Sequence, residues 1–122
     1  MNVLDASALL AYLGGEPGAA YVQELLDAGH NACGAANWSE VAQKVEAHGR
    51  DWSLAAILLD SYGLVVDPVT RADAEWAASR WRAGEGLSLG DRCCLALADR
   101  LDATAVTADA RWGEGGGVRQ IR

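Results

Sequence analysis

The sequence of 122 residues predicts a single α/β domain, residues 1–122, with a central parallel sheet flanked by helices on both faces. Short apolar stretches alternate along the chain with longer segments of helical periodicity. The length suits one hydrophobic core, and 51% hydrophobic with 22% charged residues is typical of a folded globular protein. Right-handed crossovers would bring the carboxyl ends of all strands to one edge of the sheet, where such folds bind ligands.

The strands are expected where short apolar runs are bounded by glycine or polar residues. The first is short and ends at an acid, and the third is recognised by its β-branched residues. In chain order the predicted strands are Val3–Leu4, Ala32–Ala36, Leu64–Val66, Ala105–Thr107 and Val118–Ile121.

The helices are predicted from apolar residues repeating at i, i+3 and i+4. The first carries Leu9, Leu10 and Leu13 and stops at Gly14. In the helix after Thr70, the spacing predicts that Trp81 lies in the core and that Trp76 is free to contact a partner. The remaining helices are expected from Glu16 to Gly29, from about Asn37 to Gly49, over Ser53–Leu59 and from Ser88 to Leu101.

The composition excludes several classes of protein. Seventeen Asp and Glu against ten Lys and Arg give a net charge of −7, which argues against a simple basic nucleic-acid binder. No apolar stretch approaches the ~20 residues that span a membrane, and no cationic leader precedes the first strand, so a cytoplasmic protein is expected. Cys33, Cys93 and Cys94 lack zinc or disulfide spacing and are interpreted as free thiols; His30 and His48 stand alone.

Four carboxylates are expected at the carboxyl edge of the sheet. Asp5 ends the first strand, Asp109 follows the fourth, and Glu40 and Asp91 fall in the first turns of helices. Clusters of oxygen ligands suit a hard cation such as Mg²⁺ or Mn²⁺, whereas zinc would call for His or Cys ligands. The sequence therefore predicts a divalent-metal site at this edge.

Two of these acids also have purely structural interpretations. Glu40 stands three residues after Asn37, as in a capping box, and it could instead pair with Lys44 at i+4. Asp91 stands three residues after Ser88, which is again the capping arrangement.

The other two acids differ in how easily a structural role explains them. Asp109 could be a turn residue that binds its own backbone. Asp5 resists such an explanation, because an acid that ends a buried strand lies close to the core, where an unpaired charge is costly. Four acids gathered at one edge would repel one another unless a cation were bound.

The chain resembles PIN domains, and specifically VapC-type toxin ribonucleases of type II toxin–antitoxin systems. The resemblance covers essentially the whole chain in order, and its third segment is the most specific. It rests on Val3-Leu4-Asp5-Ala6-Ser7-Ala8-Leu9-Leu10, Ser39-Glu40-Val41, Leu87-Ser88-Leu89-Gly90-Asp91-Arg92-Cys93-Cys94-Leu95-Ala96-Leu97-Ala98 and Thr107-Ala108-Asp109. One departure is Asn37-Trp38 ahead of the glutamate, where smaller or aliphatic residues are more usual.

The resemblance implies a parallel sheet of about five strands and Mg²⁺- or Mn²⁺-dependent endonucleolytic cleavage of RNA. Carried over by position, the catalytic and metal-binding acids would be Asp5, Glu40, Asp91 and Asp109. Ser7 and Thr107 look like the hydroxyls that hold the first and last of these acids in place. The resemblance also implies a VapB-like antitoxin that blocks the site, and in-line cleavage that leaves a 5′-phosphate and a 3′-hydroxyl. A symmetric homodimer is the default expectation for so small a domain.

Contact with RNA phosphates is expected from arginines beside the motifs, Arg92 and Arg111. The main alternative is a catalytically weak PIN domain that acts as a protein- or RNA-binding module. A receiver domain is disfavoured because the only lysine is Lys44, and a haloacid-dehalogenase-like phosphatase because Asp5-Ala6-Ser7 lacks a second acid.

Overall fold

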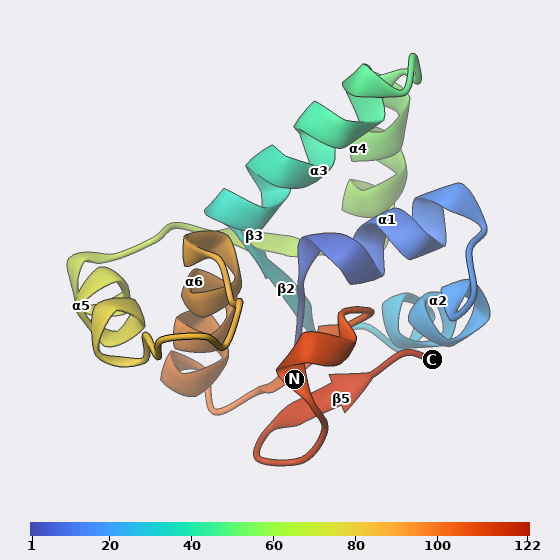
Figure 1. The fold of residues 1–122 in the computed structure, drawn as a ribbon. Helices are drawn as coiled ribbons and strands as arrows, with labels where there is room; N and C mark the ends of the chain where they lie inside the picture. The colour runs from blue at the N-terminus through green and yellow to red at the C-terminus, as the bar shows by residue number, and fades with distance from the viewer.

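Five parallel strands form the centre of the computed structural model, which describes residues 1–122. Their order across the sheet is β3-β2-β1-β4-β5, and every neighbouring pair is parallel (Figure 1). The order reverses between β1 and β4, so the crevice for a ligand is expected beyond the ends of these two strands. The strands are β1 (Asn2–Leu4), β2 (Asn31–Gly34), β3 (Val65–Asp67), β4 (Thr104–Thr107) and β5 (Val118–Gln120).

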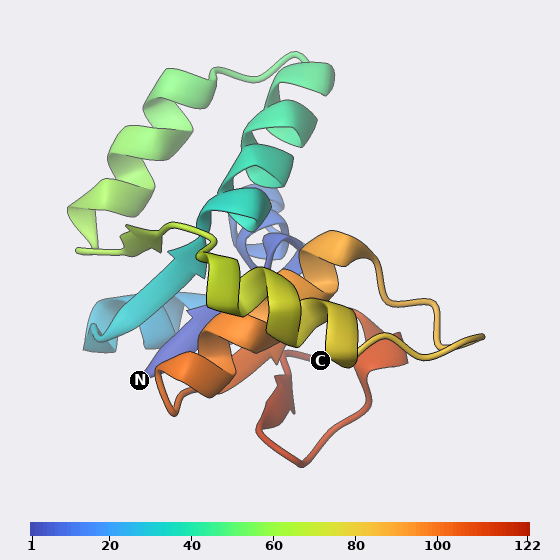
Figure 2. The same ribbon diagram turned by 90° about the vertical axis from the view of Figure 1, so that its left-hand side faces the viewer.

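Helices cover both faces of the sheet, as predicted (Figure 2). Successive strand residues point to opposite faces, so Leu4 and Val106 join the core beneath α1, α2 and α3, whereas Val3 and Ala105 pack against α6. None of the helices has the length and apolar character needed to cross a membrane. The helices are α1 (Ala6–Gly14), α2 (Ala19–Ala28), α3 (Ala35–Ala47), α4 (Trp52–Ser61), α5 (Arg71–Ser79), α6 (Leu89–Arg100) and the 3₁₀ turn η1 (Ala110–Trp112).

Helix α3 begins two residues earlier than the sequence predicts. Its N-cap is Gly34, so the preceding strand ends there rather than at Ala36. Asn37 does not cap the helix because its side chain is buried and donates from Nδ2 to the Gly90 carbonyl at 3.3 Å. Glu40 consequently lies in the second turn of α3, and the prediction that it belongs to a capping box is wrong.

Helix α5 does not carry Trp81 into the core as its spacing predicts. Asp73 is only 4% exposed, whereas Trp81 lies beyond the end of the helix and is 60% exposed, so its predicted place in the core is wrong. The reason is a polar contact: Asp73 completes a capping box with Thr70 and accepts hydrogen bonds from Arg100 of α6 at 2.9 and 3.1 Å. Trp76 is half-buried and faces the α6 side.

Candidate functional site

The carboxylate of Asp5 lies at the switch point of the sheet. Asp5 follows β1 and caps α1, accepting the backbone N–H of Ala8 at 2.8 Å. Two hydroxyls donate to the same carboxylate: Ser7 at 2.7 and 2.9 Å, and Thr107 at 2.6 Å. Asp5 is 3% exposed, and no cationic side chain pairs with it.

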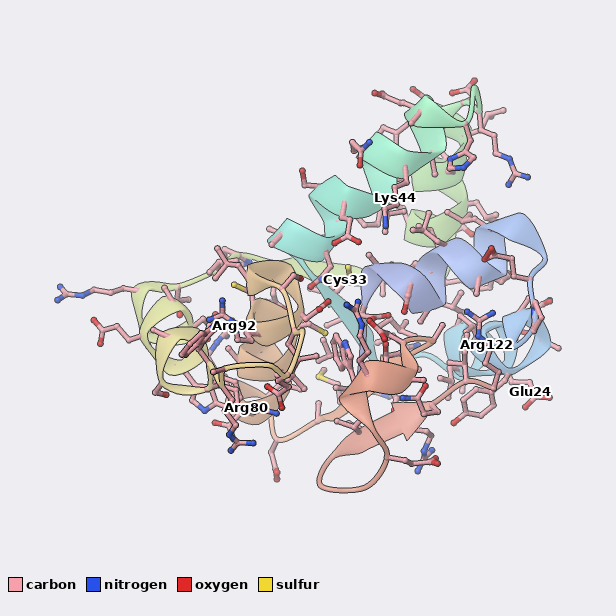
Figure 3. All side chains as sticks on the ribbon, viewed as in Figure 1. Glu24, Cys33, Lys44, Arg80, Arg92 and Arg122 are labelled. Atoms are coloured by element: carbon pink, nitrogen blue, oxygen red, sulfur yellow. The ribbon has the colours of Figure 1, made fainter.

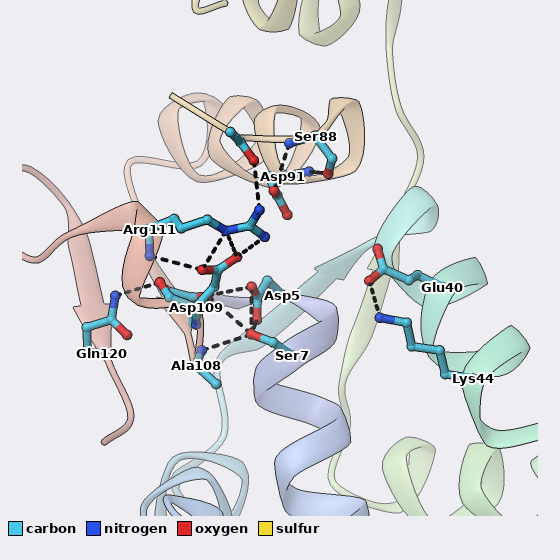
Figure 4. Close-up of polar contacts among 12 residues, drawn as sticks. Asp5, Ser7, Glu40, Lys44, Ser88, Asp91, Ala108, Asp109, Arg111 and Gln120 are labelled. Carbon is cyan, nitrogen blue, oxygen red and sulfur yellow. Dashed lines mark hydrogen bonds and ion pairs between the residues drawn. The ribbon is translucent and has the colours of Figure 1, made fainter. Parts of the chain in front are cut away.

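The same two hydroxyls connect Asp5 to the loop that follows β4 (Figure 4). Ser7 Oγ accepts the N–H of Ala108 at 2.8 Å, and Thr107 Oγ1 accepts the N–H of Asp109 at 3.0 Å. The two oxygens are 3.2 Å apart. Both hydroxyls therefore orient the Asp5 carboxylate directly. Ser7 also holds the backbone at Ala108 and Thr107 the backbone at Asp109, but neither contacts the Asp109 carboxylate.

Burial raises the pKa of Asp5 from 3.8 to about 6, and the negative charge of Asp91 adds to this effect. The hydrogen bonds from Thr107, Ala8 and Ser7 act in the opposite direction but do not compensate for it. Because the folded state binds this proton more tightly than the unfolded state, stability falls as the pH rises from about 4 to about 6. The ionised carboxylate then costs about 3 kcal/mol, which a bound cation would offset.

Asp109 is ion-paired with Arg111 in this structure. Arg111 Nη2 lies 2.6 Å from Asp109 Oδ2, and its Nε donates to both carboxylate oxygens at 3.0 and 3.1 Å. The hydrogen bonds from Arg111 lower the pKa of Asp109. Asp109 also accepts the backbone N–H of Arg111, so the predicted turn role is confirmed. The third guanidinium nitrogen, Nη1, donates to the Gly86 carbonyl at 3.1 Å.

Asp91 caps α6 with one of its carboxylate oxygens. The Ser88 N–H donates to Asp91 Oδ2 at 2.8 Å, and the Asp91 N–H donates to Ser88 Oγ at 3.1 Å, which confirms the capping arrangement. Figure 4 shows the carboxyl group directed from α6 toward Asp5. Its negative charge raises the pKa values of both Asp5 and Arg111, so Asp91 acts electrostatically on the same group of residues.

Glu40 lies on α3 beside Lys44 (Figure 4). Its Oε2 pairs with Lys44 Nζ at 3.2 Å, which confirms the alternative interpretation of an i,i+4 ion pair. Its Oε1 is 3.6 Å from the position that a β-carbon on Gly90 would take, so it lies close to the first turn of α6. Glu40, Asp5, Asp91 and Asp109 are called the acid quartet below.

Asp5, Asp91 and Asp109 lie near one another in Figure 4, with Glu40 farther off beside Lys44, but no three Asp, Glu, His or Cys side chains lie close enough together to bind one metal ion. Arg111 holds Asp109, Ser88 holds one oxygen of Asp91, and Lys44 holds Glu40. The residues nevertheless fit Mg²⁺ or Mn²⁺ in their chemistry, because all the donors are carboxylates and the buried Asp5 has no cationic partner. Binding would require Arg111 to leave Asp109.

The structure places Arg92 away from the acid quartet. Its Nη1 donates to the Ala77 carbonyl of α5 at 2.7 Å, and its buried Nε has no hydrogen-bond partner. Figure 3 shows it among the side chains between α5 and α6. The side chain thus contributes to helix packing, and of the two predicted RNA contacts only Arg111 lies at the acid quartet.

Sequence reasoning missed a second feature, a groove of about 490 Å³ along α1. Lys44, His48, Arg50 and Arg122 all line it, and so does Ser7. Lys44 and His48 are four residues apart, which places them on one face of α3. That spacing was visible in the sequence, but nothing in the sequence indicated that Arg122 lies on the same groove.

The fold is similar to those of several solved structures. A chain of a toxin–antitoxin complex from Klebsiella pneumoniae has a TM-score of 0.80 at 18% identity, covering 100% of this chain and 98% of that one. VapC20 of Mycobacterium tuberculosis, described as a sarcin–ricin loop cleaving toxin, has a TM-score of 0.73 at 16% identity, covering 97% of each chain. A protein from Pyrobaculum aerophilum has a TM-score of 0.68 at 19% identity, covering 98% of this chain and 88% of that one.

No curated protein matches the sequence. The family profile of the PIN domain, in contrast, matches residues 3–117, which is nearly the whole chain. The matched region contains all of the acid quartet and the carboxyl ends of β1 and β4, where the strand order reverses. The chain therefore belongs to the PIN domain family.

Proposed function

We propose that this protein is a metal-dependent endoribonuclease of the VapC type, the toxin of a toxin–antitoxin pair. The observation that carries the proposal is the buried Asp5 carboxylate, which lies at the switch point beside Asp91 and Asp109 without a cationic partner of its own. Membership of the PIN family and the likeness in fold to VapC20 support the same chemistry. Under this proposal the acid quartet supplies the ligands of one or two divalent ions.

Divalent metal, when bound, lowers the pKa of water and neutralises charge that develops on the phosphate during in-line attack. The protein's own residues would do the positioning. Ser7 and Thr107 hold the ionised form of Asp5 in one orientation through their hydrogen bonds. The Arg111 guanidinium, once released from Asp109, would be free to bind an RNA phosphate. In-line cleavage would leave a 5′-phosphate and a 3′-hydroxyl.

The partner proposed is a VapB-like antitoxin that blocks the acid quartet, with the toxin acting in the cytoplasm as a homodimer. The likeness in fold to a chain of a toxin–antitoxin complex supports the antitoxin. The guanidinium group of an antitoxin arginine would suit the acid quartet chemically. Arg111 already pairs with Asp109, so a guanidinium can be bound at this position.

Metal removal tests the enzymatic proposal. The purified protein is expected to cleave a panel of stem-loop RNAs, including the sarcin–ricin loop, when Mg²⁺ or Mn²⁺ is present. EDTA is expected to abolish cleavage, and excess metal to restore it, as followed on denaturing gels. Cleavage that persists in EDTA contradicts the proposed mechanism. RNA binding without cleavage in either metal would favour the alternative, a catalytically weak RNA-binding module.

A further inference from the structure

The groove along α1 collects basic side chains beside the acid quartet. Lys44 and His48 extend from α3, Arg50 follows that helix, and Arg122 comes from the far end of the chain. Figure 3 shows Lys44 and Arg122 on the two sides of α1. Lys44, His48, Arg50 and Arg122 with the face of α1 between them are called the basic groove.

This gathering is notable in a chain whose net charge is −7. Six of the ten Lys and Arg side chains form ion pairs with carboxylates. The four without such a pair are Arg50, Arg92, Arg119 and Arg122, and two of these, Arg50 and Arg122, line the basic groove. The carboxylate that lines the groove is Glu16, while Glu40 pairs with Lys44 at its border.

Backbone carbonyls orient the two unpaired arginines without neutralising them. Arg50 Nη1 donates to the Leu13 carbonyl at 3.1 Å, and Arg122 Nη1 donates to the Pro17 carbonyl at 3.4 Å. The end of the chain is itself held in place, because the N–H of Ile121 donates to the Thr107 carbonyl at 3.0 Å. Both guanidinium groups therefore keep their full charge and further N–H donors for an anionic ligand.

The basic groove adjoins the acid quartet at Ser7 and at Lys44, which pairs with Glu40. Ser7 lines the groove and also donates to the Asp5 carboxylate at 2.7 Å. A chain bound along α1 would thus reach Asp5 at its inner end. An RNA strand fits both parts, because its phosphates match the cations and one of them would arrive at the metal-binding acids. An acidic peptide would match the cations alone.

We propose that the basic groove binds the phosphates of the RNA strand that leads into the acid quartet. This inference rests on the proposed nuclease function and assigns its substrate track. The rest of the surface is acidic and repels RNA. The strand is therefore attracted mainly to the basic groove. Arg50 and Arg122 are positioning residues for RNA here; they do not touch the acid quartet.

The proposal is tested by RNA binding in a protein that does not cleave. Fluorescence anisotropy is measured with a labelled stem-loop RNA in the Asp5→Asn background, with and without Arg50→Gln and Arg122→Gln together. The double change is expected to weaken binding about 10-fold and to reduce the slope of log Kd against log salt by about 1.4, at about 0.7 per lost contact. Arg71→Gln with Arg119→Gln makes the same change in net charge outside the groove and is expected to have little effect.

Four outcomes decide the matter. We call Arg50→Gln with Arg122→Gln the groove pair, and Arg71→Gln with Arg119→Gln the control pair. The proposal would be overturned if both pairs weakened RNA binding equally, or if neither weakened it. Polyglutamate with the same total charge as the RNA is added at the same concentration as the RNA. If it displaces the RNA, the proposal is overturned in favour of an acidic protein ligand. Arg50→Lys with Arg122→Lys is expected to keep most of the binding, which separates lost charge from faulty folding; binding as weak as in the glutamine pair would contradict a phosphate track.

The nuclease proposal is separated from this one by cleavage kinetics. With Asp5 intact, the groove pair is expected to raise KM about 10-fold and leave kcat nearly unchanged, because the acid quartet is untouched. If the native protein cleaves no RNA but the groove pair still weakens RNA binding, the nuclease proposal fails while the groove assignment stands. If cleavage occurs and neither KM nor binding responds to the groove pair, the groove assignment fails alone.

Discussion

Asp5→Asn is expected to slow metal-dependent RNA cleavage by about 10³-fold. The change removes a negative ligand from the centre of the acid quartet but preserves the shape of the side chain. Asparagine keeps an oxygen that accepts the Ala8 N–H as an N-cap, and its amide nitrogen takes the place of the oxygen that faces the Thr107 hydroxyl, to which it can donate. Loss of activity would therefore report lost charge rather than lost fold. Single-turnover cleavage in Mn²⁺ measures it.

Stability provides the internal control for Asp5→Asn. The buried carboxylate has its pKa raised to about 6, so at pH 8 it is ionised at a cost that the amide does not have. In EDTA at pH 8 the variant is expected to unfold at a urea concentration equal to or above that of the native protein. Asp60→Asn, at an exposed site on α4, is expected to leave cleavage unchanged. An Asp5→Asn protein that cleaves at the native rate would contradict the site assignment.

Arg100→Gln is expected to lower the free energy of unfolding by about 3 kcal/mol at pH 7. Arg100 donates two hydrogen bonds to Asp73, which is only 4% exposed and would be left buried and unpaired. Arg100 lowers the pKa of Asp73, so the stabilising contribution is present above the unfolded pKa of about 3.9 and is lost as the pH falls through the folded value. Urea unfolding at pH 7 and pH 3.5 should therefore show a smaller effect at the lower pH.

Arg71→Gln is the matched comparison for this ion pair. Arg71 and Glu75 form an exposed i,i+4 pair on the outer side of α5, and its loss is expected to change stability by less than about 0.5 kcal/mol. Asp73→Asn combined with Arg100→Gln is expected to be less harmful than Arg100→Gln alone, since no charge is left buried. Equal effects of Arg71→Gln and Arg100→Gln would show that the α5–α6 contact does not depend on this pair.

Local patterns in the sequence were enough to predict the sheet and its covering helices. The apolar strand cores and the helical spacing depend on neighbouring residues, and the structure confirms the five parallel strands. The errors occur where one polar side chain binds a distant partner. Asn37 contacts Gly90 instead of capping α3, and Asp73 of α5 is buried against Arg100 whereas Trp81 is exposed. Contacts between residues far apart in sequence leave no local signal.

In the candidate site, too, some features follow from the local sequence and others depend on contacts between distant residues. The position of the acid quartet at one edge follows from strand ends and helix starts, which the sequence reveals. The pairing of Asp109 with Arg111 and the path of the basic groove depend on side-chain direction and on the chain end returning beside α1. Arg50 and Arg122 line the same groove only in the folded protein, so their spacing in the sequence could not have predicted that they lie on one surface.

Direct measurement of Mn²⁺ binding tests the central claim, that the acid quartet holds a divalent ion. Isothermal titration at pH 8 is expected to show saturable binding that Asp5→Asn weakens at least 10-fold. At pH 5 binding to the native protein is expected to weaken as well, because protons then compete at Asp5, whose pKa in the metal-free protein is raised to about 6. Native protein that binds no Mn²⁺, or an Asp5→Asn protein that binds it equally well, would contradict the claim.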